Sequence, residues 1–208
     1  MNLKDALAAG LAKQLGHPRG LRGRLVGALL NRANSRPVTG AVDALGLRAG
    51  ETAADIGFGG GFGLALLLGR VGPAGLVHGV EVSETMFARA THRFARADRL
   101  RLHRGSITDL PLDDASVDAL ITCNTVYFVA DLDRACAELA RILRPGGRAV
   151  VGIGDPAEMA KMPFTEHGFR LRPVAEVIAA LESAGLVLTE DRRLGKSERG
   201  FHLLLASA

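Results

Sequence analysis

The chain has 208 residues, of which 48% are hydrophobic and 23% are charged, and its formal net charge is +4. This length suits one domain with a substantial core, and no apolar run approaches the ~20 residues of a membrane span, which excludes a membrane-spanning protein. Residues 1–5 begin an amphipathic segment instead of a secretory leader, and Cys123 and Cys136 are too few for a zinc site or a disulfide framework, so we expect a cytoplasmic protein with reduced core thiols.

The first 50 residues are basic and helical in pattern. They carry eight Lys or Arg against two Asp or Glu, a net charge of +6, whereas the rest of the chain carries −2. Glycine and proline breaks predict helices over 3–15, 22–33 and 36–46. We expect residues 1–50 to form a helical cap on a core of residues 51–208. His17, in the first break, is a candidate base, and a plain turn residue is the alternative.

A basic segment can bind nucleic acid, and a second group of arginines lies further along the chain. The group comprises Arg89, Arg93, Arg96, Arg99, Arg101 and Arg104. Aromatic residues make up only 4% of the chain, which leaves few rings on which bases stack. We therefore expect no nucleic-acid partner and interpret the arginines as a solvated face.

A glycine-rich turn follows the first predicted strand, Thr52 to Ile56. Five of the seven residues from Gly57 to Gly63 are glycine, and an apolar helix pattern follows at Leu64 to Leu68. A ligand can approach the backbone N–H groups of such a loop closely, at the positive end of the helix dipole. The loop therefore predicts a site for a nucleotide-like molecule, and a tight turn without a ligand is the alternative.

The spacing of the glycines separates two kinds of nucleotide. The dinucleotide fingerprint Gly-x-Gly-x-x-Gly fails, because Phe62, Leu64 and Leu66 stand where its third glycine would fall. The pattern Asp55-x-Gly57-x-Gly59-x-Gly61 instead resembles motif I of class I S-adenosylmethionine-dependent methyltransferases. In that family the loop holds the methionine end of the cofactor.

A second buried strand, Leu76 to Val80, ends in Glu81. An acid at this position can accept hydrogen bonds from both hydroxyls of a ribose, and we expect the strand end to be exposed when the site is empty. Ser83 is a plausible N-cap of the next helix. The segment from Glu81 through Met86 resembles that of methyltransferases of ubiquinone and menaquinone biosynthesis.

The resemblance continues through the next two strands, Leu100 to Gly105 and Ala119 to Thr122. Residues 106–118 are similar to the family's Gly-Asp-Ala-x-x-Leu-Pro-Phe-x-Asp-x-Ser-Phe-Asp segment, and residues 139–147 to its helix and turn before strand five. In the family an acid contacts the adenine amino group, but Ser106 stands in its place. The Ser106 hydroxyl and the backbone around Ile107 are the candidates for that contact.

The family implies an α/β fold: a Rossmann-like seven-stranded sheet of order 3-2-1-4-5-7-6, with helices on both faces and the last strand antiparallel. Its later elements are predicted at 148–153 (strand), 155–169 (a lid connection), 173–184 (helix), and 186–194 and 201–206 (strands).

The resemblance also implies the site. The predicted cofactor-binding residues are Asp55, Gly57, Phe58, Gly59, Gly61, Glu81, Val82, Met86, Ser106, Ile107, Asn124 and Thr125. Candidate catalytic residues are Tyr127, His167 and His17, with a structural ring as the alternative for Tyr127. We expect no metal, because no Asp/Asp/Asn triad of the catechol type is present.

The sequence therefore predicts a methyltransferase that transfers a methyl group from S-adenosyl-L-methionine to an O, N or C atom of a small molecule. Strand four lacks the Asn/Asp-Pro-Pro-Tyr/Phe and Pro-Cys motifs, which disfavours methylation of adenine, glutamine or cytosine C5. The alternatives are a catalytically inactive S-adenosylmethionine-binding scaffold or regulatory protein and, less favoured, a nicotinamide-dependent oxidoreductase. A homodimer is possible.

Overall fold

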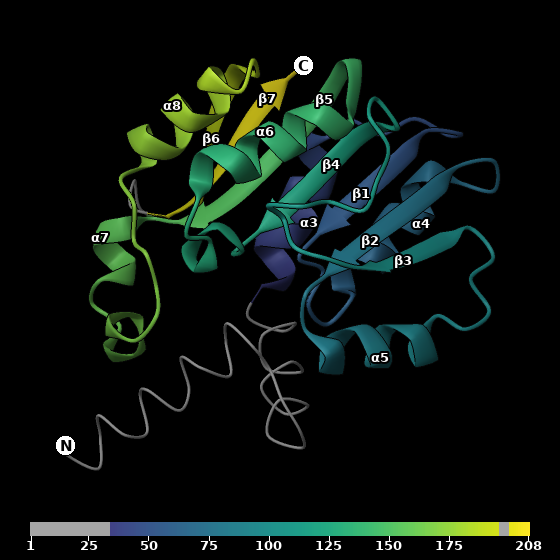
Figure 1. Ribbon diagram of the computed structural model, residues 1–208, viewed down its shortest axis with the longest axis horizontal. Coiled ribbons are helices and arrows are strands. Elements are labelled where there is room, and N and C mark those ends of the chain that lie inside the picture. Colours follow the sequence, from purple (N-terminus) through teal and green to yellow (C-terminus); the bar gives the residue numbers. More distant parts are fainter. Residues whose placement is uncertain (1–33, 196–199) are drawn as a thin grey trace.

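The computed structural model describes residues 34–195 and 200–208 (Figure 1). Its strands form a seven-stranded sheet of order β3-β2-β1-β4-β5-β7-β6. They are β1 (Thr52–Ile56), β2 (Leu76–Glu81), β3 (Leu100–Arg104), β4 (Val117–Cys123), β5 (Leu143–Gly154), β6 (Val187–Leu194) and β7 (Phe201–Ser207). β1 to β5 are parallel, and β7 pairs antiparallel with both β5 and β6. The predicted fold class and strand order are confirmed.

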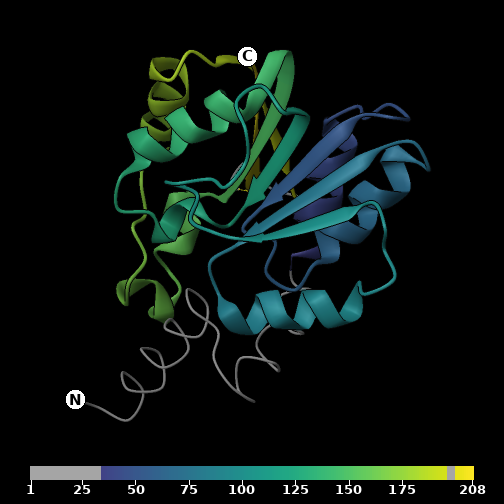
Figure 2. The same cartoon turned by 45° about the vertical axis from the view of Figure 1, so that its right-hand side comes forward.

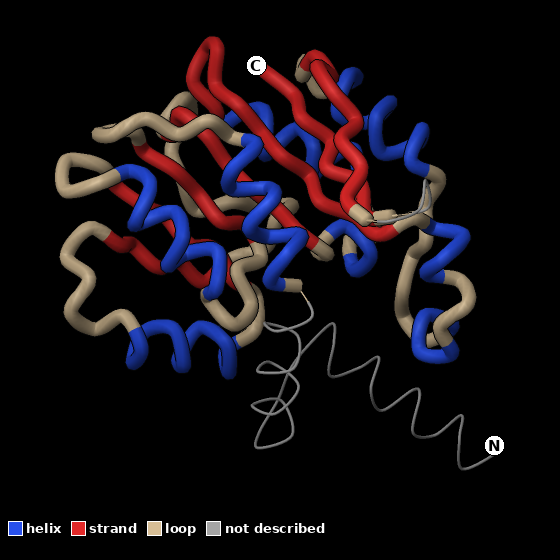
Figure 3. Tube along the Cα trace, turned by 180° about the vertical axis from the view of Figure 1, so that it is seen from behind, coloured by secondary structure: helices blue, strands red, loops and turns tan. Residues whose placement is uncertain are grey.

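Helices cover both faces of the sheet, as Figures 1 and 3 show from opposite sides. The described helices are α3 (Ser35–Ala44), α4 (Phe62–Val71), α5 (Glu84–Arg93), α6 (Leu132–Ile142), α7 (Pro156–Met159) and α8 (Val174–Ser183), with 3-10 turns η1 (Val126–Phe128) and η2 (Pro163–Glu166). Within the described ranges, no helix is long and apolar enough to cross a membrane.

Two apolar cores result from this layering. On one face, α3 and α4 pack on the sheet through residues such as Val42, Leu64 and Leu67. On the other, α6 and α8 pack through residues such as Leu139, Ile142 and Leu181. β4 lies between the cores, and burial on both sides explains why its sequence is almost continuously apolar.

The chain before β1 is described from Asn34 onward, so the helices predicted at 3–15 and 22–33, with His17, lie outside the described residues. The third predicted helix is α3. Ala41, Val42 and Leu45 bury its C-terminal half in the core, while Pro37 and Val38 bring its first turn to the cavity described below.

β5 begins at Leu143, five residues before the predicted start. Leu143 pairs with Val117 of β4, and the register then shifts before Ala119 pairs with Arg148. Gly146 adopts a φ of +74°, which glycine reaches without strain. The glycine turn is therefore an irregularity inside a longer strand rather than a loop before it.

Candidate functional site

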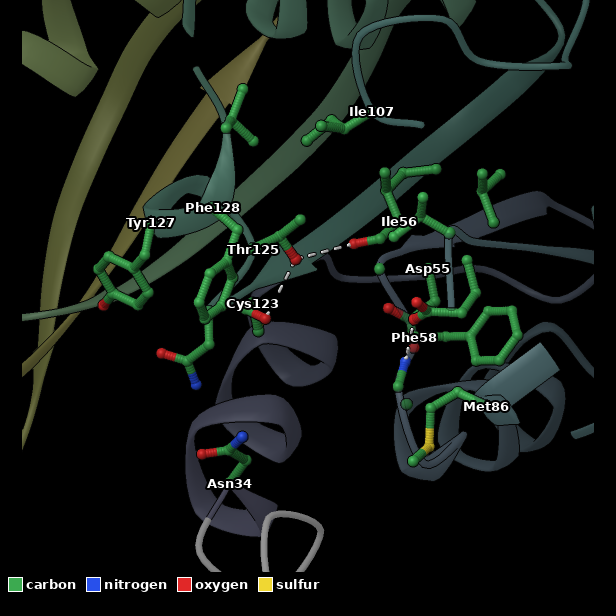
Figure 4. A pocket seen from close by; sticks show the side chains of 18 of the residues that line it. Asn34, Asp55, Ile56, Phe58, Met86, Ile107, Cys123, Thr125, Tyr127 and Phe128 are labelled. Atoms are coloured by element: carbon green, nitrogen blue, oxygen red, sulfur yellow. Dashed lines mark hydrogen bonds between the residues drawn. The ribbon is translucent and has the colours of Figure 1, made fainter. Parts of the chain in front are cut away.

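A cavity of about 700 Å³ opens where the parallel strands end. Its wall includes the last residues of β1, β2, β4 and β5, the glycine loop and the first turn of α3. Open α/β sheets bind ligands at this edge. In Figure 4, Asp55, Phe58 and Met86 lie across the cavity from Tyr127 and Phe128. We call these two sides by the lining residues that they comprise. The glycine-loop end comprises residues 55–60, 62–63, 81–82 and 86, and the aromatic end comprises residues 127–128, 159, 162, 164, 169 and 201.

The Glu81 carboxylate is held in place at the glycine-loop end. Its Oε2 accepts a hydrogen bond from the Gly59 N–H and its Oε1 from the Ser83 N–H, both at 2.8 Å. Only 7% of the residue is exposed, so the expectation of an exposed strand end is wrong. The N–H groups orient the carboxylate, whose oxygens can each accept more than one hydrogen bond.

The glycines of the loop are needed for different structural reasons. Gly59 has a φ of +51° and lines the cavity, and a Cβ there would meet no protein atom within 4 Å. At Gly57, with φ +78°, a Cβ would collide with the Thr125 hydroxyl. Gly61 does not line the cavity: it is the N-cap of α4, and its Cβ would lie 2.9 Å from Phe94.

Asp55 lies beneath this loop, and 5% of it is exposed. Its carboxylate stands so close to Gly63 that a Cβ on that residue would overlap it. Burial, with a smaller contribution from the negative charge of Glu81, raises the pKa of Asp55 to about 8. The Asp55 carboxyl is therefore mostly protonated at neutral pH, in contrast to an ordinary aspartate.

The far wall of the glycine-loop end is apolar. Phe58, Met86 and Ile107 are buried and line the cavity, and Val82 is half exposed at its rim. Ser83 caps α5 as predicted, because its hydroxyl accepts from the Met86 N–H at 3.4 Å.

The residues after β3 and β4 complete this end. The Ser106 hydroxyl lies 2.8 Å from the Thr108 hydroxyl and accepts from the Thr108 N–H, so it already has partners within its own turn. Asn124 adopts a φ of +58°, a left-handed conformation that asparagine tolerates better than most residues. Asn124 and Thr125 both line the cavity, directly after β4.

The aromatic end gathers rings from separate parts of the chain. Phe169 packs against Phe128, Phe164 and Tyr127, with ring centroids 4.7, 5.6 and 5.8 Å apart. Six of the chain's eight phenylalanines and its single tyrosine line the cavity. Met159 and Met162 join them, so the predicted lid connection does form part of the wall.

The candidate catalytic residues have different outcomes. Tyr127 is buried and lines the cavity; its hydroxyl accepts a hydrogen bond from the Gly154 N–H. Burial raises the pKa of Tyr127, so the phenol stays protonated, which argues against a base and for an anchored ring. His167 lies outside the cavity lining. His17 lies outside the described residues.

Eleven of the twelve residues predicted to bind the cofactor line the cavity, and Gly61 alone does not. Sequence reasoning missed Phe62, Phe128, Asp131, Arg134 and Phe201, which also line it. Asp131 carried a detectable signal, since an aspartate directly before an apolar helix pattern predicts an N-cap, and it accepts from the Arg134 N–H at 3.0 Å.

Comparison with known proteins identifies the family. The sequence matches the family described as Methyltransferase domain over residues 54–151. YdaC, an uncharacterized methyltransferase of Bacillus subtilis (strain 168), is 30% identical over 139 residues, which are 67% of this chain and 75% of that protein. The chain belongs to the S-adenosylmethionine-dependent methyltransferase family. The resemblance read from the glycine loop and Glu81 is thereby confirmed.

Two other proteins are similar to this methyltransferase. An arsenite methyltransferase of Halobacterium salinarum is 36% identical over 116 residues, which are 55% of this chain and 29% of that protein. A SAM-dependent methyltransferase from Aquifex aeolicus has the same fold, with a TM-score of 0.73, 23% identity and coverage of 96% of this chain and 97% of that one. The chain spans a third or less of the length of some of the curated relatives that it matches.

The cavity fits S-adenosylmethionine, the cofactor of this family. Glu81 presents oriented carboxylate oxygens suited to a ribose diol, and the open space at Gly59 leaves room that a Cβ would fill. Phe58, Met86 and Ile107 provide apolar surface suited to adenine. A cavity of about 700 Å³ lies within the usual range of ligand sites and leaves the aromatic end for a second molecule.

Proposed function

We propose that this methyltransferase transfers a methyl group from S-adenosylmethionine to an O, N or C atom of a neutral, apolar small molecule. The observation that carries the proposal is the division of one cavity into a glycine-loop end and an aromatic end. The first has the features of a cofactor site, and the second has the rings of a small-molecule site. An acceptor bound at the aromatic end would lie beside a cofactor bound at the glycine-loop end.

The chain's own residues would act mainly by binding and alignment. S-adenosylmethionine supplies the electrophilic methyl group, so the protein need only hold an acceptor in line with it and exclude water. Glu81 and the Gly59 backbone would fix one partner, while Phe128 and Phe169 would face the other. Tyr127, as a protonated phenol, would help to shape the wall rather than remove a proton.

Charge at the aromatic end supports a neutral acceptor. Among the described residues that line this end, none is a lysine or an arginine, and Asp131 and Arg134, the charged lining residues that follow η1 in the chain, are exposed. An anionic acceptor would lose hydration there without a described cationic partner. The cytoplasmic location, the homodimer and the cap formed by residues 1–50 stay predictions.

Thermal unfolding with and without S-adenosylhomocysteine tests the cofactor assignment. A ligand at ~100 times its Kd adds about 2.7 kcal/mol to the free energy of unfolding, and we expect such a gain with S-adenosylhomocysteine but not with NAD or ATP. No shift with saturating S-adenosylhomocysteine would contradict the proposal. Stabilisation by NADH alone would favour the oxidoreductase.

Turnover tests catalysis separately. We expect methyl-labelled S-adenosylmethionine to transfer label to members of a panel of neutral aromatic amines and phenols, and not to their sulfonated counterparts. Cofactor binding without turnover on any acceptor would favour the inactive scaffold. Transfer to the sulfonated compounds would refute the neutral, apolar acceptor while leaving the cofactor assignment intact.

A further inference from the structure

His202 of β7 lies between two carboxylates behind the aromatic end of the cavity. Only 2% of it is exposed. Its Nδ1 is 2.9 Å from Asp191 Oδ1, and its Nε2 is 3.5 Å from Asp155 Oδ2. Among the described residues Nε2 has no partner of hydrogen-bond geometry. A neutral imidazole carries a proton on one nitrogen only, so only the imidazolium offers an N–H to both carboxylates.

Asp155 connects this histidine to the cavity wall. Its Oδ1 caps α7 by accepting from the N–H groups of Ala157 and Glu158, at 2.9 and 3.1 Å. α7 ends at Met159, which lines the aromatic end. Figure 1 shows α7 at the edge where β7 begins. The same carboxylate therefore holds the start of a wall segment and faces His202.

Neighbouring residues place both strands of this junction on the cavity. Gly154 and Phe201, the residues before Asp155 and His202, pair across β5 and β7. Both line the cavity, and the Gly154 N–H donates to the Tyr127 hydroxyl. A shift of Asp155 away from His202 would therefore change the position of residues that line the cavity.

Among the described residues, few charged groups face the imidazole. Asp155 faces it from the connection after β5 and Asp191 from β6, while Arg193 Nε lies 3.8 Å from Asp191 Oδ2. On α7, Glu158 pairs with Lys161 at 2.8 Å. Although desolvation acts in the opposite direction, the N–H of Glu158 and the proximity of His202 hold the pKa of Asp155 below its usual range. A carboxylate thus faces each ring nitrogen of His202.

We infer that His202 is a positioning residue whose proton holds Asp155, and with it the start of α7, against β7. When His202 loses that proton to solvent, Asp155 faces an unprotonated nitrogen and α7 is released, which loosens the aromatic end. The inference rests on the proposed function only in identifying this end as the acceptor side. Acceptor binding then depends on the protonation of His202, whereas cofactor binding does not.

The experiment follows α7 and the aromatic end separately, in the full chain between pH 5 and 8.5. Hydrogen exchange, corrected for intrinsic rates, reports the amides of Ala157 and Glu158. Fluorescence of N-phenyl-1-naphthylamine, a neutral aromatic probe, reports binding at the aromatic end. We expect both the amide protection and the probe affinity to fall several-fold as the His202 ring loses its proton in NMR titration.

Two variants and one control decide the outcome. In His202→Asn and in Asp155→Asn, which keeps a residue able to cap α7, both signals should lose this pH dependence. Asp155→Asn also provides the test if His202→Asn does not fold. His167→Asn, a substitution of a histidine in the same connection but outside the cavity lining, should behave like the wild type.

Two results would overturn the inference. One is a His202→Asn or Asp155→Asn profile that parallels the wild type, and the other is a wild-type profile without a step at the His202 titration. S-adenosylhomocysteine affinity is measured in parallel and should not change between these variants. If none of these proteins bound S-adenosylhomocysteine, the proposed function would be contradicted, but the result on α7 could still be interpreted.

Discussion

Glu81 serves the fold as well as the site, because the N–H groups of Gly59 and Ser83 both donate to its carboxylate. We expect Glu81→Ala to weaken S-adenosylhomocysteine binding about 10- to 100-fold, since a hydrogen bond to a charged group contributes ~1.5–3 kcal/mol. The same change leaves two N–H groups without their acceptor, so the free energy of unfolding should also fall by about 1–3 kcal/mol. Titration calorimetry and urea unfolding measure the two effects.

Glu81→Gln is the matched control for this prediction. Glutamine keeps one acceptor oxygen but turns its NH2 group toward the other N–H donor, so only part of the folding loss should be recovered while the binding loss largely remains. Unaltered S-adenosylhomocysteine affinity in both variants would refute the assignment of Glu81 to the cofactor.

Asp55 makes stability depend on pH in the direction opposite to most carboxylates. Its pKa is raised to about 8 in the fold, whereas in the unfolded chain an aspartate ionises near 3.9. Between these values the unfolded state binds fewer protons, so this group's contribution to stability is complete below pH ~4 and is lost as the pH rises toward 8.

Asp55→Asn removes this titration with little change of shape. Relative to the wild type, the variant should therefore become more stable as the pH rises from 5 to 7.5, by most of the ~1.4 kcal/mol per pH unit that one proton allows. Urea midpoints at both pH values check this. Parallel pH profiles for the two proteins would mean that Asp55 is ionised in the fold.

For single residues, the sequence predicted where a side chain lies better than what it contacts. The position of Glu81 was predictable, because the last residue of the second parallel strand lies at the carboxyl edge of the sheet, where such sheets bind ligands. The burial of Glu81 was not, since it depends on the folding of the glycine loop over the carboxylate. The exclusion of His167 from the cavity lining depends on the path of an irregular connection. Such a path has no hydrophobic period from which it could be predicted.

Substitutions of neighbouring glycines in the glycine loop should have different effects. A side chain at Gly59 meets open cavity, so Gly59→Val should abolish cofactor binding while the far-UV circular dichroism stays native. Its left-handed φ of +51° adds a folding cost of about 1–2 kcal/mol. Calorimetry with S-adenosylhomocysteine checks the binding.

Gly61→Val provides the contrast, because its Cβ would press on Phe94 instead of entering the cavity. This variant should lose more stability than Gly59→Val and should bind cofactor to the extent that it folds. Normal cofactor binding by Gly59→Val would reduce the loop to a simple turn.

Elements with a regular pattern were predicted closely, and irregular ones were not. The bounds of β1 are those predicted, because a buried strand ends where the glycines begin. β5 starts earlier than predicted, because the Arg-Pro-Gly-Gly turn is absorbed into the strand through its pairing with Val117. Likewise α7 and η2 are single turns within the predicted connection, too short for a helical period to appear.

At the scale of the molecule, composition hid the most informative feature. Aromatic residues are 4% of the chain, which suggests that rings matter little, yet six phenylalanines and the tyrosine converge on one cavity. Phe58 and Phe62 lie at the glycine-loop end, and the other rings, which form the aromatic end, come from η1, the connection after β5 and the start of β7. Only the fold brings these segments together, so no local sequence pattern announces the aromatic end.

The arginine group raises the question of a nucleic-acid partner for the whole molecule, and several of its members have structural roles. Arg93 donates to the Gly60 carbonyl at 3.1 Å and Arg101 to the Asp98 carbonyl at 2.7 Å. Arg99 donates to the Gly72 carbonyl, and Arg104 pairs with Glu84 at 3.9 Å. These contacts brace loops and helix ends, as expected of a solvated face.

We therefore predict no shift of tRNA, ribosomal RNA fragments or duplex DNA by the full chain at physiological ionic strength. A protein that neutralises 6–10 phosphates loses roughly 10³- to 10⁵-fold in affinity between 50 and 200 mM salt, so weak binding that appears only at low salt would be the nonspecific attraction of a basic protein. Binding that survives physiological salt, with methyl incorporation into the nucleic acid, would overturn the small-molecule acceptor. It would leave the family and its cofactor untouched, because the family rests on the sequence comparison and the cofactor assignment on the glycine-loop end.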